Sequence, residues 1–209
     1  MPRTGFKYVM LWLGLLLLSP MSSTAALPKI EDTPQPTSLA GQLLVATPEM
    51  GDPRFSHAVI LMVQHNKDGA LGIVINRPFE ELPMAKLLEA LGQDRAGITG
   101  QIRIFAGGPV EPQVGFIVHS ADYRRARTID IDGRVAMTSD PQVLHDIGRN
   151  EGPSKNLVAF GYAGWGPGQL EGELALGAWF TTPEDPRLVF DADRQKLWEI
   201  ALARRTIPL

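Results

Sequence analysis

The chain has 209 residues, with 20 lysines and arginines against 23 aspartates and glutamates, and it contains no cysteine. Without cysteine it cannot be a disulfide scaffold, an iron–sulfur protein, a Cys-ligated zinc protein or an enzyme with a thiol nucleophile. The mildly acidic balance argues against broad electrostatic binding to nucleic acid.

The first 26 residues have the three-part pattern of a secretory signal peptide. Arg3 and Lys7 give a positive start, an uncharged apolar run of 11 residues follows over 8–18, and small residues suited to a peptidase end at Ala26. The apolar run is well short of the ~20 residues that a helix needs to span a bilayer. We expect cleavage and export to the periplasm. An uncleaved anchor, or a mis-assigned start codon and a cytoplasmic protein, are the alternatives.

Residues 27–40 carry three prolines among polar residues, which predicts a flexible tether. Removing the leader leaves 183 residues with 18 basic and 23 acidic side chains, a net charge of −5. This length suits one globular domain, expected over residues 41–209, and such a domain buries roughly 70% of the surface that its unfolded chain exposes. We expect no membrane span in the mature chain.

The remaining elements follow from apolar runs, which predict strands, and from helical spacing of apolar residues. In chain order we predict strands at 42–46, 58–64 and 69–76, a helix at 84–91, strands at 102–106, 115–119, 128–131 and 134–138, a helix at about 140–149, a strand at 157–162, and helices at 169–176 and 193–204.

Strands and helices interleave along the chain, but several neighbouring strands are close enough to form hairpins. Asp132-Gly133, for example, is a strong hairpin-turn signal. The pattern therefore predicts a mixed α/β protein of the α+β type, in which helices pack on a strongly bent mixed β-sheet, rather than a doubly wound parallel sheet.

Three stretches, in this order, resemble the YqgE/AlgH family, and the resemblance extends over residues 41–182. They are residues 43–48 (LLVATP), 52–55 (DPRF) and 65–78 (HNKDGALGIVINRP); residues 107–110 (GGPV) with Gly115-Phe116 and His119; and residues 161–171 (GYAGWGPGQLE) leading to Glu173-Leu174 and Trp179.

The resemblance implies a single domain with a small, partly barrel-like sheet surrounded by helices. It also implies a reputed regulatory role in alginate production. Two features depart from the family. Gln64 stands where such proteins often carry Glu before the histidine, and the export leader is unusual in a family that is mostly cytoplasmic.

Two of the four histidines are candidate site residues. His65 ends a predicted strand before a glycine-rich hairpin, so that it could face a cleft together with the amide of Asn76. The alternative is a histidine that bonds to the backbone and an asparagine that closes a turn before Pro78. His119 follows a strand and is either a second candidate base or a structural residue.

The stretch from Tyr162 to Glu173 is the most informative. A strand leads into a glycine-rich turn around Trp165, and a helix begins near Gln169. Its free N–H groups would favour an anion, but Glu171 and Glu173 already lie in the first turn, where they complement the helix dipole and would repel phosphate. Trp165 either fills the barrel or, with Tyr162, forms a pocket wall to which Gln169 and Glu171 add polar contacts.

Other site types lack their signatures. There is no HxH, HExxH or His-rich cluster for a metal, and we expect no cofactor. The turn at 107–109 lacks the Lys and Ser/Thr of a phosphate-binding loop, and the hairpin at 130–133 lacks the later ligands of a calcium loop. No basic recognition helix is visible, so we expect no direct contact with nucleic acid.

These observations lead to three functional hypotheses. The first is a non-catalytic domain that binds a small ligand or a partner segment through Asn76, Tyr162, Trp165 and Gln169, with His65 nearby. The second is a hydrolase-type enzyme with His65 or His119 as base and Glu171 as acid. The third is a regulatory protein that affects gene expression through protein contacts.

Overall fold

The computed structural model describes residues 38–205. The expected signal peptide and all but the last three residues of the expected tether lie outside this range. Within residues 38–205, no helix is both long and apolar enough to cross a bilayer.

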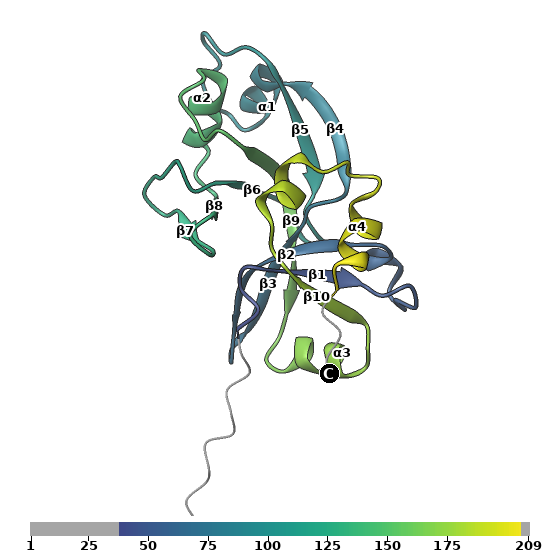
Figure 1. The fold of residues 1–209 in the computed structure, drawn as a ribbon. Helices are drawn as coiled ribbons and strands as arrows, with labels where there is room; N and C mark the ends of the chain where they lie inside the picture. The colour runs from purple at the N-terminus through teal and green to yellow at the C-terminus, as the bar shows by residue number, and fades with distance from the viewer. Residues whose placement is uncertain (1–37, 206–209) are drawn as a thin grey trace, which may run out of the picture. The chain divides into compact units, whose positions relative to one another are not determined.

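Between residues 38 and 205, ten strands and four short α-helices follow each other in a mixed order (Figure 1). The strands are β1 (Gln42–Ala46), β2 (Val59–Asn66), β3 (Gly69–Val74), β4 (Pro78–Pro83), β5 (Gln101–Ala106), β6 (Val110–Ser120), β7 (Ile129–Asp130), β8 (Val135–Thr138), β9 (Asn156–Trp165) and β10 (Trp179–Pro183). The helices are α1 (Met84–Ala90), α2 (Gln142–Gly148), α3 (Gln169–Ala175) and α4 (Leu197–Ala203), with a 3₁₀ turn η1 (Pro53–Phe55) and a π-helical turn η2 (Arg187–Asp191).

The strands form one curled sheet in the order β10-β1-β2-β3-β9-β6-β8-β7, and β5 joins it beside β9 with β4 on its outer edge. All pairs are antiparallel except β5–β9. The mixed α/β class and the bent, half-barrel sheet with surrounding helices are therefore confirmed.

Strand β9 is where the sheet curls. Its first half lies between β5 and β6, and its last residues, Ala163 to Trp165, pair with β3. The change of partner occurs at Gly161, which has a φ of +75° that only glycine adopts readily. The turn between β5 and β6 lies directly on this bend, because a Cβ on Gly108 would be 2.1 Å from the carbonyl carbon of Tyr162. Glycines at both positions are thus needed for the close approach.

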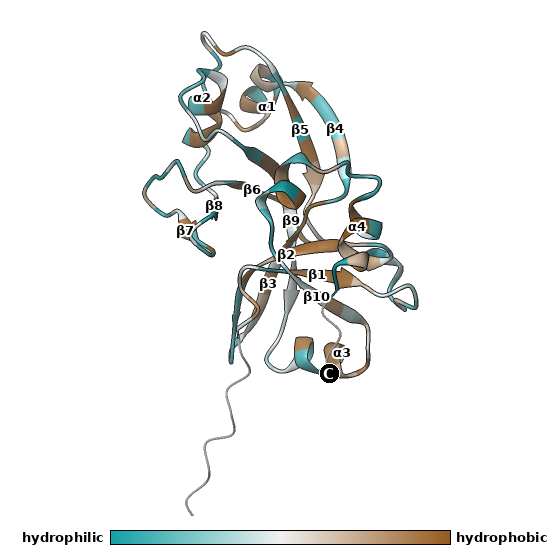
Figure 2. Ribbon diagram, viewed as in Figure 1, coloured by the Kyte–Doolittle hydropathy of each residue, from teal (hydrophilic) through white to brown (hydrophobic). Residues whose placement is uncertain are grey.

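In the part of the chain that the structure describes, three hydrophobic clusters fill the two faces of the sheet. One lies around Leu61 and Leu157 and is covered by η2 and α4. A second lies around Trp165 and Trp179 beside α3, and a third packs α1 and α2 on β5, β6 and β9. Figure 2 shows the apolar colouring concentrated on strands such as β1 and β2. Burying these apolar side chains is the main stabilising contribution, at roughly 25 cal/mol for each Å² removed from water.

The elements differ from the sequence expectation mainly at the sheet edges. Strands β4 and β10 were not expected. β4 is an exposed edge strand without the alternating pattern of a half-buried strand, and Pro78 and Pro83 bound it. The last helix begins at Leu197 rather than at residue 193. The Asp193 carboxylate accepts the N–H of Gln195 and holds residues 194–196 in a turn before the helix.

Candidate functional site

His65 lies buried on β2 and has hydrogen-bond partners at both ring nitrogens. Its Nδ1 is 3.0 Å from the backbone nitrogen of Leu39, whose N–H must be the donor. The other nitrogen, Nε2, therefore carries the proton and donates it to the Glu171 carboxylate over 3.0 Å. A protonated ring would place two N–H groups against each other at Leu39. The arrangement thus holds a neutral imidazole with no free lone pair for a substrate.

Glu171 is the partner of this imidazole on α3. The backbone N–H of Glu171 itself and, after it, the hydrogen bond from His65 lower the pKa of the Glu171 carboxyl, while burial raises it. The carboxyl is therefore ionised near neutral pH. It is suited to orienting His65 and poorly suited to donating a proton as a general acid.

Glu173, two residues further along α3, accepts hydrogen bonds from three side chains. Trp165 Nε1 and Trp179 Nε1 both donate to its Oε2, over 2.9 and 2.8 Å, and Gln169 Nε2 donates to its Oε1 over 2.9 Å. The ring of Phe55 packs on both indoles, at centroid distances of 6.4 and 5.5 Å. Sequence reasoning saw in Glu173 only a charge that complements the helix dipole, and missed that it joins two distant tryptophans.

The structure brings His65, Glu171, Trp165 and Gln169 to the same end of the molecule, around α3. Tyr162 belongs to a different hydrophobic cluster from Trp165, because the two residues are three positions apart on β9 and point to opposite faces. A small cavity of about 190 Å³ lies beside Trp165, between the β2–β3 hairpin and the end of β9. That these residues bind a ligand stays a prediction.

Two other candidates lie away from α3. Asn76 accepts the N–H of Val59 over 2.9 Å and donates to the carbonyl of His57 over 2.8 Å, which fastens the loop that precedes β2. His119 is fully buried on β6, with Nδ1 2.9 Å from the Ser120 carbonyl and the ring edge-on to Tyr123. Its Nε2 has no partner among residues 38–205.

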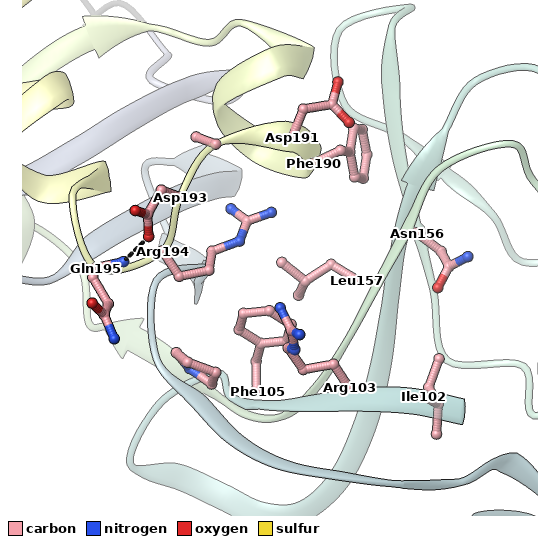
Figure 3. Close-up of a pocket in the computed structure, with 12 residues that line it drawn as sticks. Ile102, Arg103, Phe105, Asn156, Leu157, Phe190, Asp191, Asp193, Arg194 and Gln195 are labelled. Carbon is pink, nitrogen blue, oxygen red and sulfur yellow. Dashed lines mark hydrogen bonds between the residues drawn. The ribbon is translucent and has the colours of Figure 1, made fainter. Parts of the chain in front are cut away.

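Sequence reasoning missed two larger cavities that flank η2. The first, which we call the arginine cavity, holds about 600 Å³ (Figure 3). It lies where β5, β9 and the segment after η2 meet. Its lining residues are Pro78, Ile102, Arg103, Phe105, Asn156, Leu157, Phe190, Asp191, Ala192, Asp193, Arg194 and Gln195.

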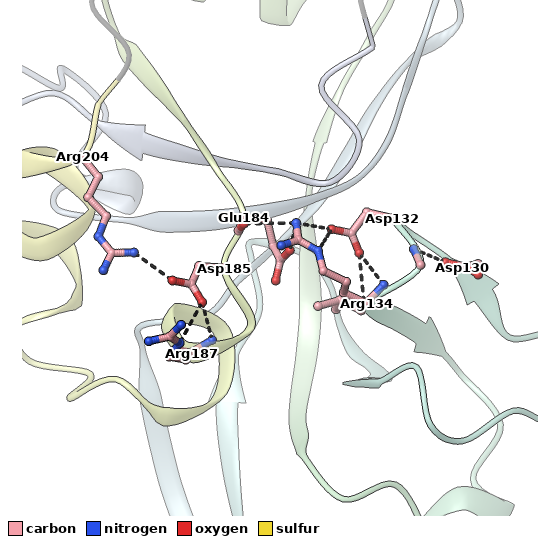
Figure 4. Close-up of polar contacts among 9 residues, drawn as sticks. Asp130, Asp132, Arg134, Glu184, Asp185, Arg187 and Arg204 are labelled. Atoms are coloured by element: carbon pink, nitrogen blue, oxygen red, sulfur yellow. Dashed lines mark hydrogen bonds and ion pairs between the residues drawn. The ribbon is translucent and has the colours of Figure 1, made fainter.

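The second, the carboxylate cavity, holds about 630 Å³ and lies between the end of β10 and the start of β8. The Glu184 side chain is completely buried there, 2.7 Å from an Arg134 guanidinium nitrogen, and the same guanidinium pairs with Asp132 (Figure 4). Burial and, after it, the neighbouring Asp132 carboxyl raise the pKa of Glu184 to about 8. Arg134 opposes this shift. Neither cavity has a sequence signature, since each is lined by charged residues from distant segments.

The described part of the chain contains no group of three or more His, Asp or Glu side chains that could hold a metal ion.

Comparisons with known proteins point to one family. The family described as AlgH-like (DUF179) matches residues 43–209. The UPF0301 proteins of Jannaschia sp. (strain CCS1) and Sphingopyxis alaskensis are both 44% identical to this chain, over 166 and 168 residues, which cover 78% and 80% of this chain and 86% and 89% of those proteins.

Two solved structures are also similar. The solution structure of the AlgH protein from Pseudomonas aeruginosa is 41% identical, with a TM-score of 0.70 over 81% of this chain and 89% of that chain. The crystal structure of DIP2367 from Corynebacterium diphtheriae has a TM-score of 0.62 over 80% of this chain and 87% of that chain. It is 24% identical and therefore shows the fold alone.

Proposed function

This chain belongs to the AlgH-like family, and we propose that it is a non-catalytic binding domain that holds a small molecule in the arginine cavity. The observation that carries the proposal is the cavity itself. Its volume of about 600 Å³ falls within the range of ~300–1,000 Å³ that is usual for small-ligand sites. Apolar side chains such as Phe105 and Leu157 share its lining with polar groups from several elements, so the cavity can contact both apolar and polar parts of a small molecule.

The state of the histidine site supports binding rather than catalysis. A general base needs a free lone pair within reach of its substrate. In His65 that lone pair accepts the Leu39 N–H, and the opposite N–H is held by Glu171. Both ring nitrogens of His65 are therefore used in hydrogen bonds within the protein, which disfavours the hydrolase hypothesis based on His65 and Glu171.

A thermal-denaturation screen of the purified full-length protein tests the proposal. The panel contains small carboxylates, phosphate esters, amines and neutral sugars, and a ligand that binds only the folded state raises the melting temperature with concentration. We expect saturable stabilisation by at least one class without its chemical conversion. Gln195→Trp, on the cavity lining, should abolish it, whereas the matched exposed variant Gln113→Trp should not.

Two results would contradict the proposal. One is turnover of any panel compound that is lost in His65→Gln and Glu171→Gln variants that remain folded. The other is ligand stabilisation that Gln195→Trp leaves intact, because the ligand would then bind elsewhere.

We also propose that the protein works after export, as its leader pattern predicts. Intact-mass measurement on protein from fractionated cells tests this. A periplasmic species that starts near Ala26 or Leu27 is the expected result, and a full-length chain in the cytoplasmic fraction would contradict it.

A further inference from the structure

Arg194 is a partly buried cation in the arginine cavity without a carboxylate partner. Its two terminal nitrogens donate to the backbone carbonyls of Leu188 and Val189, over 3.1 and 2.7 Å, and its guanidinium lies 5.5 Å from the centre of the Phe105 ring. No Asp or Glu within residues 38–205 forms an ion pair with it. These two bonds use two of the five guanidinium N–H groups, so that three remain for other acceptors.

Arg103 brings a second guanidinium into the same space. It comes from β5, on the opposite side of the cavity from Arg194 (Figure 3). Burial and, after it, the charge of Arg103 lower the pKa of Arg194. An arginine nevertheless stays protonated in proteins, so the two positive charges persist on the two sides of the cavity. They repel each other, and an anion held between them would relieve this repulsion.

Two carboxylates, Asp191 and Asp193, also line the cavity, but neither forms an ion pair with Arg194. Asp191 is paired with Lys155 over 2.5 Å, and its charge only partly offsets the effects of burial and of Arg103 on Arg194. The Asp193 carboxylate accepts the N–H of Gln195. Glu81 pairs with Arg103 over 2.9 Å, but both side chains are more than half exposed, and such surface pairs are weak and easily exchanged.

Building on the proposed function, we propose that the ligand of the arginine cavity is a small anion. Its carboxylate or phosphate group binds the guanidinium groups of Arg194 and Arg103, and its body lies on the apolar floor of Phe105 and Leu157. The free N–H groups of a guanidinium match two oxygens of such a group in a planar, bidentate arrangement. The Asn156 side chain, which also lines the cavity, offers a further polar contact.

Calorimetric titration of the purified full-length protein with probes of similar size tests this proposal. Phenyl phosphate and benzoate are the anions, benzyl alcohol is the neutral probe and benzylamine is the cation. We expect at least one anion to bind about tenfold or more tightly than benzyl alcohol or benzylamine, and its affinity to fall as salt is added. The ratio between phenyl phosphate and benzoate identifies which anionic group the site prefers.

Charge-removing variants locate the site. Arg194→Gln and Arg103→Gln should each weaken binding of the preferred anion, by about tenfold or more for the first, while Arg149→Gln, an exposed arginine outside the cavity, should leave it unchanged. Arg194 also holds two backbone carbonyls, so its variant can lose stability. Arg103→Gln, whose side chain is more than half exposed, then decides the question.

The outcomes separate this inference from the proposed function. If benzyl alcohol or benzylamine binds as tightly as the anions and Gln195→Trp abolishes that binding, the cavity binds ligands but the anion inference is wrong. Anion binding that both arginine variants leave unchanged also overturns the inference. If none of the four probes and no compound of the thermal panel binds, both proposals fall.

Discussion

The α3 end and the η2 side of this protein use polar side chains in opposite ways. Around α3, the groups of His65, Gln169, Glu171 and Glu173 bind each other, the backbone or an indole N–H. Beside η2, Arg194 keeps unused donors next to a cavity, and Glu184 is buried in a charged cluster with a raised pKa. Residues that belong to a recognisable sequence motif can thus be structural, while the polar groups that are available to a ligand belong to residues that form no motif.

The largest effect is expected from Glu173. In Glu173→Leu, two buried indole N–H groups lose their acceptor, and each unsatisfied group costs about 1–3 kcal/mol. We expect the free energy of unfolding to fall by about 3 kcal/mol or more in urea denaturation. Glu151→Leu, an exposed matched control, should change it by no more than about 0.5 kcal/mol. Equal effects in the two variants would show that the α3 network is not structural.

The next effect is a pH dependence at Glu184. Its pKa is about 8 in the folded state against 4.5 as the ordinary value. Between these values the folded state holds a proton that the unfolded state has lost, so the contribution of Glu184 to stability is greatest below pH 4.5 and falls as pH rises towards 8. The slope is at most about 1.4 kcal/mol per pH unit.

Urea denaturation of Glu184→Gln at pH 5, 6 and 7 checks this assignment. The variant should lose the part of the downward slope that Glu184 contributes, while other titrating groups keep theirs. An unchanged slope would place the group with a raised pKa elsewhere.

A smaller loss, of about 2 kcal/mol, is expected for His65→Ala, because the variant removes the acceptor of the Leu39 N–H and the donor to Glu171. Hydrogen exchange provides the sharper measurement. The Leu39 amide should exchange faster in the variant, while amides in the middle of β6 keep their protection. Slow exchange at Leu39 in His65→Ala would show that the bond to Nδ1 contributes little.

The smallest effect on stability is expected at Glu81. Its ion pair with Arg103 is more than half exposed, so Glu81→Gln should change the free energy of unfolding by at most ~1 kcal/mol. The same variant frees the Arg103 guanidinium, and the preferred anion should therefore bind severalfold more tightly in calorimetry. Unchanged or weaker binding would indicate that Arg103 does not reach the ligand.

The sequence predicted the buried strands well, because continuous apolar runs such as those of β2 and β9 have few alternatives. It also named His65 and Glu171 together as a possible base and acid, and His65 Nε2 lies 3.0 Å from Glu171 Oε1. It could not predict β4, whose residues are exposed, nor the arginine cavity. That cavity depends on Arg103 and Arg194 meeting across the fold, and two isolated arginines have no local pattern that shows such a meeting.

Strand β9 links the two contrasting ends of the molecule, because it pairs with β5 and β6 along one half and with β3 along the other. If one half of β9 separated from its partner strands, the continuous strand that holds the other half in the sheet would be disrupted. Thermal unfolding followed through residue-specific signals of Trp165 and of Phe105 should consequently give one cooperative curve. Two fragments made by dividing the chain at Gly161 should not fold independently.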